Sequence, residues 1–94
     1  MITLEKFEAG DMQRLIDWVP DVDFLLQWSG PKYVFPLDEK QLSATLELTR
    51  PDNPPHFMFK AILAGATIGH IEVMGVNYVE KSAVLARGLI GPKQ

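Results

Sequence analysis

His70 and Glu72 are the residues of this sequence whose types and spacing most readily suggest chemistry. They stand two positions apart in the apolar-rich run from Thr67 to Val76, and side chains two apart on a strand share one face. A metal site would need further ligands, and the chain offers only one more histidine, His56, and no cysteine. We therefore predict no metal and leave two interpretations of Glu72: a general base, or a solvated glutamate on a strand face.

Arg87 is the only charged residue in the stretch from Ser82 to Ile90. A guanidinium in such a strand can extend to solvent, pair with Glu72 or Glu80, or bind a phosphate, and pairing is the interpretation we favour. Gly88 beside it has three interpretations: a bulge, a close approach of another backbone, or an ordinary glycine at a loop edge.

Four aromatic residues are close together in the first half of the sequence, namely Phe24, Trp28, Tyr33 and Phe35. They predict either a wall beside a ligand or ordinary filling of the core, and filling of the core is the simpler interpretation for Phe24.

Two to three short helices are predicted around these residues. Asp11 is suited to cap the first, and Pro20 ends it, after one apolar stripe made of Met12, Leu15, Ile16 and Val19. The second helix reaches Trp28, with Asp21 or Asp23 as its cap.

The third helix has the clearest start in the chain. The Asp38 side chain can accept a hydrogen bond from the Gln41 amide while the Gln41 side chain reaches back, a variant of the capping box. Leu37 and Leu42 stand where a hydrophobic staple would place them.

Strands are predicted before and after the helices, from the apolar pattern of Ile2 to Phe7, His56 to Ala64, Thr67 to Val76 and Ser82 to Ile90. Gly65-Ala66 is expected to form a two-residue hairpin turn. The last strand has small or apolar residues on both of its faces, a pattern typical of a strand covered on both sides. With no helix or strand after it, we expect one of its edges and part of one face to be bare. This order predicts an α+β fold in one domain, residues 1–94: a first strand, two to three short helices and a three-stranded antiparallel meander.

Composition excludes several classes of function. The formal net charge is −3 and no two basic residues are adjacent, so we predict no nucleic acid and no membrane as partner. The N-terminus lacks the pattern of a signal peptide, and the absence of cysteine rules out disulfides. We expect a cytoplasmic protein.

Three segments in this order resemble the GNAT superfamily of N-acetyltransferases: residues 24–31 (FLLQWSGP), 68–72 (IGHIE) and 86–92 (ARGLIGP). The resemblance implies an acetyl-CoA-dependent enzyme that acetylates a primary amine on a small molecule or peptide. It implies that the last strand binds the cofactor through Arg87, Gly88, Leu89 and Ile90, and that Phe24, Trp28 and Tyr33 border the acceptor. Glu72, or a water, would then be the base.

In the family, a glycine-rich loop that binds the pyrophosphate follows this strand, and the sequence ends at Gln94, where that loop would open. We therefore expect an N-terminal half that is inactive by itself and binds acetyl-CoA weakly. Its predicted partner is a second copy, through the last strand, or a separate C-terminal half. The alternative function is a non-catalytic module that associates with itself through that exposed strand.

Overall fold

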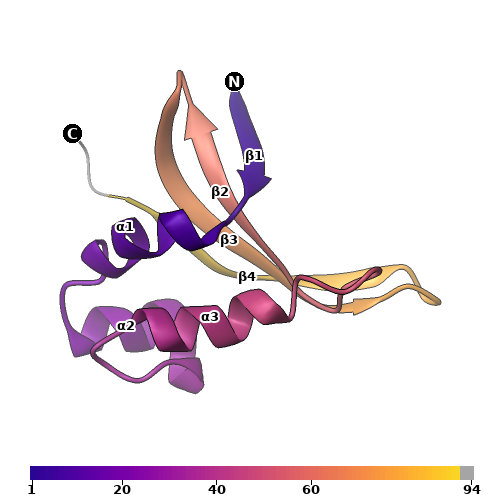
Figure 1. The fold of residues 1–94 in the computed structure, drawn as a ribbon, viewed down its shortest axis with the longest axis horizontal. Coiled ribbons are helices and arrows are strands. Elements are labelled where there is room, and N and C mark those ends of the chain that lie inside the picture. The colour runs from indigo at the N-terminus through magenta and orange to yellow at the C-terminus, as the bar shows by residue number, and fades with distance from the viewer. Residues whose placement is uncertain (92–94) are drawn as a thin grey trace.

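The computed structural model describes residues 1–91 (Figure 1). A first strand precedes three helices, and three more strands follow them: β1 (Ile2–Lys6), α1 (Met12–Asp17), α2 (Val22–Ser29), α3 (Glu39–Glu47), β2 (Phe57–Leu63), β3 (Ala66–Asn77) and β4 (Ser82–Ile90). This confirms the predicted α+β class and the antiparallel meander. β1 adds to the meander by pairing with β2, so the sheet has four strands in the order β1-β2-β3-β4. The predicted loop at residues 92–94 lies outside the described residues.

Two helix caps are confirmed. The Asp21 side chain accepts from the Phe24 amide at the start of α2, and the Asp38 side chain accepts from the Gln41 amide at the start of α3. The prediction that the Gln41 side chain bonds back to the start of the helix is wrong. The Gln41 side chain instead bonds the amide and carbonyl of Val34, because the loop before α3 lies within its reach.

Asp11 stands at the N-cap of α1 as predicted, but its side chain makes no capping hydrogen bond to that helix. A short 3-10 turn, Ala9–Asp11, precedes that helix, and the Asp11 carboxylate accepts from the Glu8 amide at the start of the turn. The buried carboxylate also binds the Lys60 ammonium at 2.9 Å and the Arg14 guanidinium at 2.8 Å. Asp11 therefore ties the first helical segment to β2.

The hairpin turn between β2 and β3 lies one residue earlier than predicted. Ala64 and Gly65 have φ of 52° and 82°, and Leu63 pairs with Ala66. Positive φ at both central residues is the conformation that matches the twist of the flanking strands. The turn therefore consists of Ala64-Gly65 rather than Gly65-Ala66.

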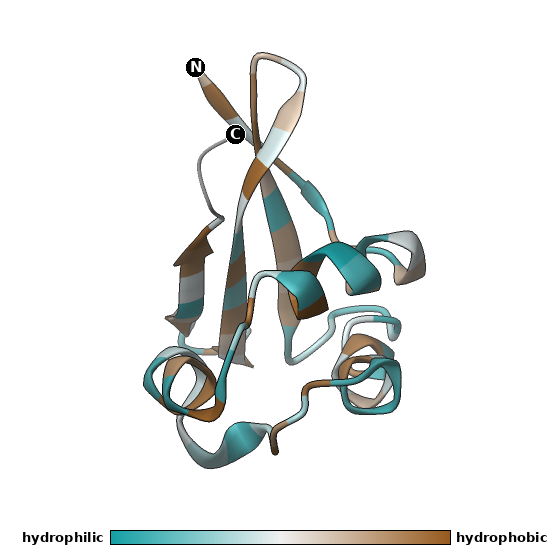
Figure 2. Ribbon diagram, turned by 90° about the vertical axis from the view of Figure 1, so that its left-hand side faces the viewer, coloured by the Kyte–Doolittle hydropathy of each residue, from teal (hydrophilic) through white to brown (hydrophobic). Residues whose placement is uncertain are grey.

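The core lies between the helices and one face of the sheet. Figure 1 shows the helices grouped at one end of the molecule, and Figure 2 shows their brown apolar stretches alternating with teal polar ones. The buried apolar residues come from all three helices, their loops and the sheet: Phe7, Met12, Leu15, Val19, Leu25, Tyr33, Leu37, Leu42, Leu46 and Met58. In residues 1–91, no helix is long and apolar enough to cross a membrane.

The expectation that part of one face of the last strand is bare is confirmed for the described residues. Val84, Leu85 and Ile90 of β4 are 59%, 72% and 73% exposed. Regular alternation also stops within the strand, because the register against β3 shifts between His70 and Glu72. The helices therefore cover only part of one side of β4.

Candidate functional site

Four charged or titratable side chains form one buried group: His70 and Glu72 of β3, Arg87 of β4, and His56 just before β2. Glu72 of β3 is fully buried, at 0% exposure, and both of its carboxylate oxygens have partners. Oε1 accepts from the Arg87 Nε at 2.7 Å and lies 2.8 Å from the His56 Nε2. Oε2 lies 2.9 Å from the His70 Nε2. This confirms the predicted pairing of Arg87 with Glu72, adds His70 and His56 as further partners, and shows that Glu72 is not a solvated glutamate.

The surroundings of Glu72 stabilise its charged form. Burial by itself would raise the pKa of this carboxyl, but the hydrogen bonds and charges of His70 and Arg87 outweigh it and lower the pKa to about 2. Tyr33 nearby is affected in the opposite sense, since burial and the charge of Glu72 raise its pKa to about 12. The site therefore holds an ionised carboxylate and a neutral phenol over the ordinary pH range.

Arg87 forms a bulge in β4. Its φ is 50°, and two residues of β4, Arg87 and Gly88, stand between the pairs His70–Leu89 and Glu72–Ala86. Contacts on both its side chain and its backbone hold this conformation. The side chain, 7% exposed, is bound to Glu72, and the carbonyl accepts from the Trp28 indole Nε1–H at 2.8 Å. The bulge that we considered at Gly88 is therefore present, with the left-handed residue at Arg87.

Trp28 and Tyr33 lie together beside His70 and Arg87. The Trp28 ring stacks on Tyr33 at 5.8 Å between centroids, and its edge contacts His70 at 5.8 Å. The Tyr33 hydroxyl donates to the Thr45 hydroxyl at 2.9 Å. Phe24 packs against the core, in agreement with the simpler interpretation, and Trp28 and Tyr33 also belong to that core. The structure thus gathers Trp28 and Tyr33 beside Arg87.

Sequence reasoning gave His56 no role beyond that of a spare histidine. His56 stands directly before β2, and its imidazole reaches Glu72 of β3, sixteen positions along the chain. No local pattern indicates such a contact. Within residues 1–91, no group of three His, Cys, Asp or Glu side chains is arranged to hold a metal ion.

The far side of β4 leaves backbone groups open. The Gly91 amide donates to the Ile68 carbonyl at 2.7 Å. By the alternation of an antiparallel ladder, Leu89 then turns its amide and carbonyl toward β3, and Ile90 turns them outward. A side chain added at Gly88 would meet no atom within 4 Å, so the space beside the bulge is also open.

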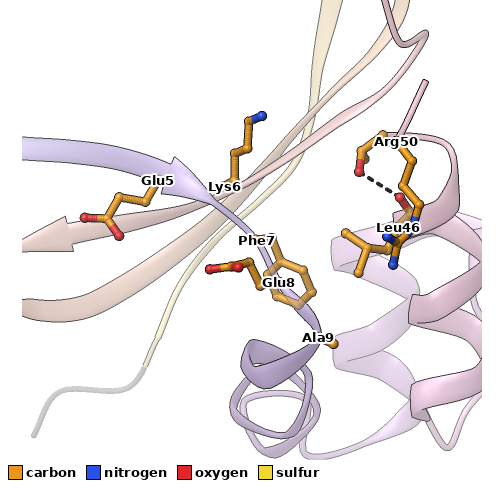
Figure 3. A pocket seen from close by; sticks show the side chains of 8 residues that line it. Glu5, Lys6, Phe7, Glu8, Ala9, Leu46 and Arg50 are labelled. Atoms are coloured by element: carbon orange, nitrogen blue, oxygen red, sulfur yellow. Dashed lines mark hydrogen bonds between the residues drawn. The ribbon is translucent and has the colours of Figure 1, made fainter. Parts of the chain in front are cut away.

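A pocket of about 690 Å³ lies elsewhere, between the end of β1 and the end of α3 (Figure 3). It is lined by Glu5, Lys6, Phe7, Glu8, Ala9, Leu46, Thr49 and Arg50. None of the residues predicted to bind cofactor or acceptor lines it.

Solved structures of acetyltransferases match this fold. A chimera of the Vibrio cholerae spermidine N-acetyltransferase SpeG with hSSAT is 22% identical over 97% of this chain, which spans 51% of that protein, at a TM-score of 0.69. The V. cholerae spermidine N-acetyltransferase in complex with CoA and spermine is 20% identical, with coverage of 97% and 52% and a TM-score of 0.68. A Trypanosoma brucei acetyltransferase matches at 13% identity, 98% and 61% coverage and a TM-score of 0.53.

No family model matches the chain, and no curated protein matches it in sequence. The structural matches show that the chain has part of the GNAT fold, as the sequence resemblance predicts. The chain spans about half the length of the spermidine N-acetyltransferases that it matches.

Proposed function

We propose that this chain, which has a partial GNAT fold, is the part of an acetyl-CoA-dependent N-acetyltransferase that holds the thioester arm and faces the amine. The observation that carries the proposal is the bulged strand β4. Glu72 binds the Arg87 side chain, and Trp28 donates to the Arg87 carbonyl. By the alternation of the ladder, the amide and carbonyl of Ile90 face the open edge of β4. An extended amide-containing arm can bond to such an edge as another strand would.

The chemistry would be direct acyl transfer. The lone pair of a neutral amine attacks the thioester carbonyl, the new C–N bond forms, and the C–S bond breaks to release the thiolate of CoA. An amide N–H fixed near the bulge suits the oxygen on which charge develops. The proton lost by the amine passes to a base and finally to water or the thiolate.

Glu72 is placed to shape this site. Both of its oxygens already have partners, and its pKa of about 2 makes it a weak proton acceptor near neutral pH. That Glu72 is the general base stays a prediction, and these contacts favour the other option, a water. In the proposal, Glu72 orients Arg87 and thereby the bulge.

The acceptor is proposed to be a primary amine on a small molecule or peptide. Trp28 and Tyr33 lie directly beneath the bulge, next to the backbone that would hold the thioester. One matching structure contains CoA and spermine, a polyamine, which supports an amine of this class.

The test is a titration of the ¹⁵N-labelled chain with acetyl-CoA, followed by amide chemical shifts. We expect shifts concentrated at Gly88, Leu89 and Ile90, because these residues border the open edge. S-acetylpantetheine, which has the arm without the nucleotide, should shift the same amides. Adenosine 3′,5′-bisphosphate, which lacks the arm, is the matched control and should leave them in place.

Millimolar acetyl-CoA that leaves the amides of residues 88–90 unchanged would contradict the proposal. So would shifts confined to the pocket at the end of β1, since that site lies away from the bulge.

A further inference from the structure

The backbone next to His56 is attached to the far end of β3. His56 follows Pro54 and Pro55 and directly precedes β2. The Pro55 carbonyl accepts from the Val76 amide at 3.2 Å, and the Pro54 carbonyl accepts from the Tyr78 hydroxyl at 2.7 Å. Each proline also has a fixed φ, which leaves this segment few other conformations. The imidazole of His56 therefore starts from a well-held piece of backbone.

The hydrogen bonds around Glu72 can run in only one direction. An ionised carboxylate only accepts, so the Nε2 of His56 and the Nε2 of His70 each donate to it. The His70 Nδ1 is buried and has no hydrogen-bond partner among the described residues, which suits a ring with hydrogen on Nε2 alone. With neutral imidazoles, the charges of Glu72 and Arg87 cancel, and a paired charge is the kind that can be buried.

His56 and Arg87 bind the same oxygen of Glu72. The Arg87 Nε and Nη2 lie 2.7 and 2.6 Å from Oε1, and the His56 Nε2 lies 2.8 Å from it. The His56 Nε2 is also 3.5 Å from the Arg87 Nη2. Oε1 is thus held from two segments, β4 and the residue before β2. Without His56, only the long Arg87 side chain would hold this oxygen, and the two groups could move together.

We propose that His56 is a positioning residue for acetyl transfer, because its Nε2–H fixes the Glu72 oxygen that holds Arg87 and thereby the bulge of β4. The inference rests on the function proposed above, in which the backbone after the bulge holds the thioester arm. The φ of Arg87 is 50°, a conformation that persists only when neighbouring contacts maintain it. His56 supplies such a contact through Glu72, from a point thirty-one positions from Arg87 in the chain.

Two variants of the full chain test this role, with S-acetylpantetheine as the probe. His56→Leu removes the ring and its N–H, whereas His56→Gln removes the ring but keeps a side-chain N–H donor. The pair therefore differs in the donor and not in the loss of the aromatic ring. Binding is measured from the amide shifts of residues 88–90. We expect His56→Leu to weaken it about fivefold, the size of one hydrogen bond, and His56→Gln to restore most of this loss.

Met58→Leu is the matched control. Met58 pairs with Glu72 across the two strands and is 3% exposed, so it is as deeply buried as His56 and as near to the carboxylate. Its side chain is apolar, and exchange with leucine conserves volume. Binding of S-acetylpantetheine should therefore stay at the wild-type level. A His56→Leu chain that loses stability but binds as tightly as this control would overturn the positioning role.

Two measurements on the free chain need no ligand. The Arg87 Nε–H should exchange with water faster in His56→Leu than in the wild type and His56→Gln. Nitrogen-15 shifts of the wild-type rings should show hydrogen on the Nε2 of His56, a result that stands even if a variant fails to fold. Hydrogen on the His56 Nδ1 alone, or equal Arg87 exchange in all three proteins, would overturn the proposal. A wild type that binds no S-acetylpantetheine would overturn the proposed function, whereas these two measurements would still decide whether His56 holds Arg87.

Discussion

At the scale of single residues, Glu72 is buried and held through both of its carboxylate oxygens. It carries a negative charge with no exposure to water, and Arg87, His56 and His70 replace the solvent around it. Removing one member of such a group is costly, because the charge that is left stays buried without compensation.

Glu72→Gln is therefore expected to lower the free energy of unfolding by about 3–5 kcal/mol, since it leaves the Arg87 guanidinium buried without its counter-ion. Urea denaturation at neutral pH measures this loss. Glu80→Gln is the control. That side chain lies in the exposed turn after β3, so its replacement should change the free energy by less than about 0.5 kcal/mol. Equal stability of the two variants would show that the buried group contributes little.

The sequence allowed part of this group to be predicted. His70 and Glu72 share a face because strand side chains alternate, and Arg87 is the only charge in its strand. The contact with His56 and the Trp28 bond to the Arg87 carbonyl join segments far apart in the chain, so no local pattern reveals them.

At the scale of elements, the start of α3 depends on one side chain. Asp38 Oδ1 accepts from the Gln41 amide at 3.0 Å. Asp38→Ala should lower the free energy of unfolding by about 1 kcal/mol, because a helix-end amide loses its partner. In a domain of this size, that corresponds to a melting temperature lower by about 4–8 °C in a calorimetric scan. Asp38→Asn retains the hydrogen-bond acceptor, so it should keep most of the wild-type stability. If Asp38→Asn is as unstable as Asp38→Ala, the effect comes from the lost charge rather than from the lost acceptor.

Elements were predictable where the signal is local. The caps at Asp21 and Asp38 and the apolar runs of the strands fixed helices and strands to within a few residues. The turn at Ala64 was misplaced, and the positive φ of the bulge falls on Arg87 rather than on the neighbouring Gly88, because a non-glycine residue adopts positive φ at each of these places. Such a conformation depends on neighbours, here Glu72 and Trp28 for Arg87, rather than on the residue type.

At the scale of the whole molecule, two depressed carboxyl pKa values predict acid sensitivity. The pKa of Glu72 falls from an ordinary 4.5 to about 2. Burial would raise the pKa of Asp11, but hydrogen bonds from Lys60, Arg14 and the Glu8 amide lower it. In both cases the native state binds fewer protons than the unfolded chain, so their stabilisation is complete above about pH 4.5 and is lost on acidification; for Glu72 the loss extends to about pH 2.

For Glu72 the difference corresponds to about 3 kcal/mol. Urea titrations at a series of pH values between 6 and 2 should therefore show the free energy of unfolding falling on acidification. Glu72→Gln should fall less steeply over the same range, because it lacks the group whose pKa is most depressed, and the remaining slope should come partly from Asp11. Parallel curves for the wild type and the variant would mean that Glu72 titrates normally in the folded chain, and that the buried cations do not hold its charge.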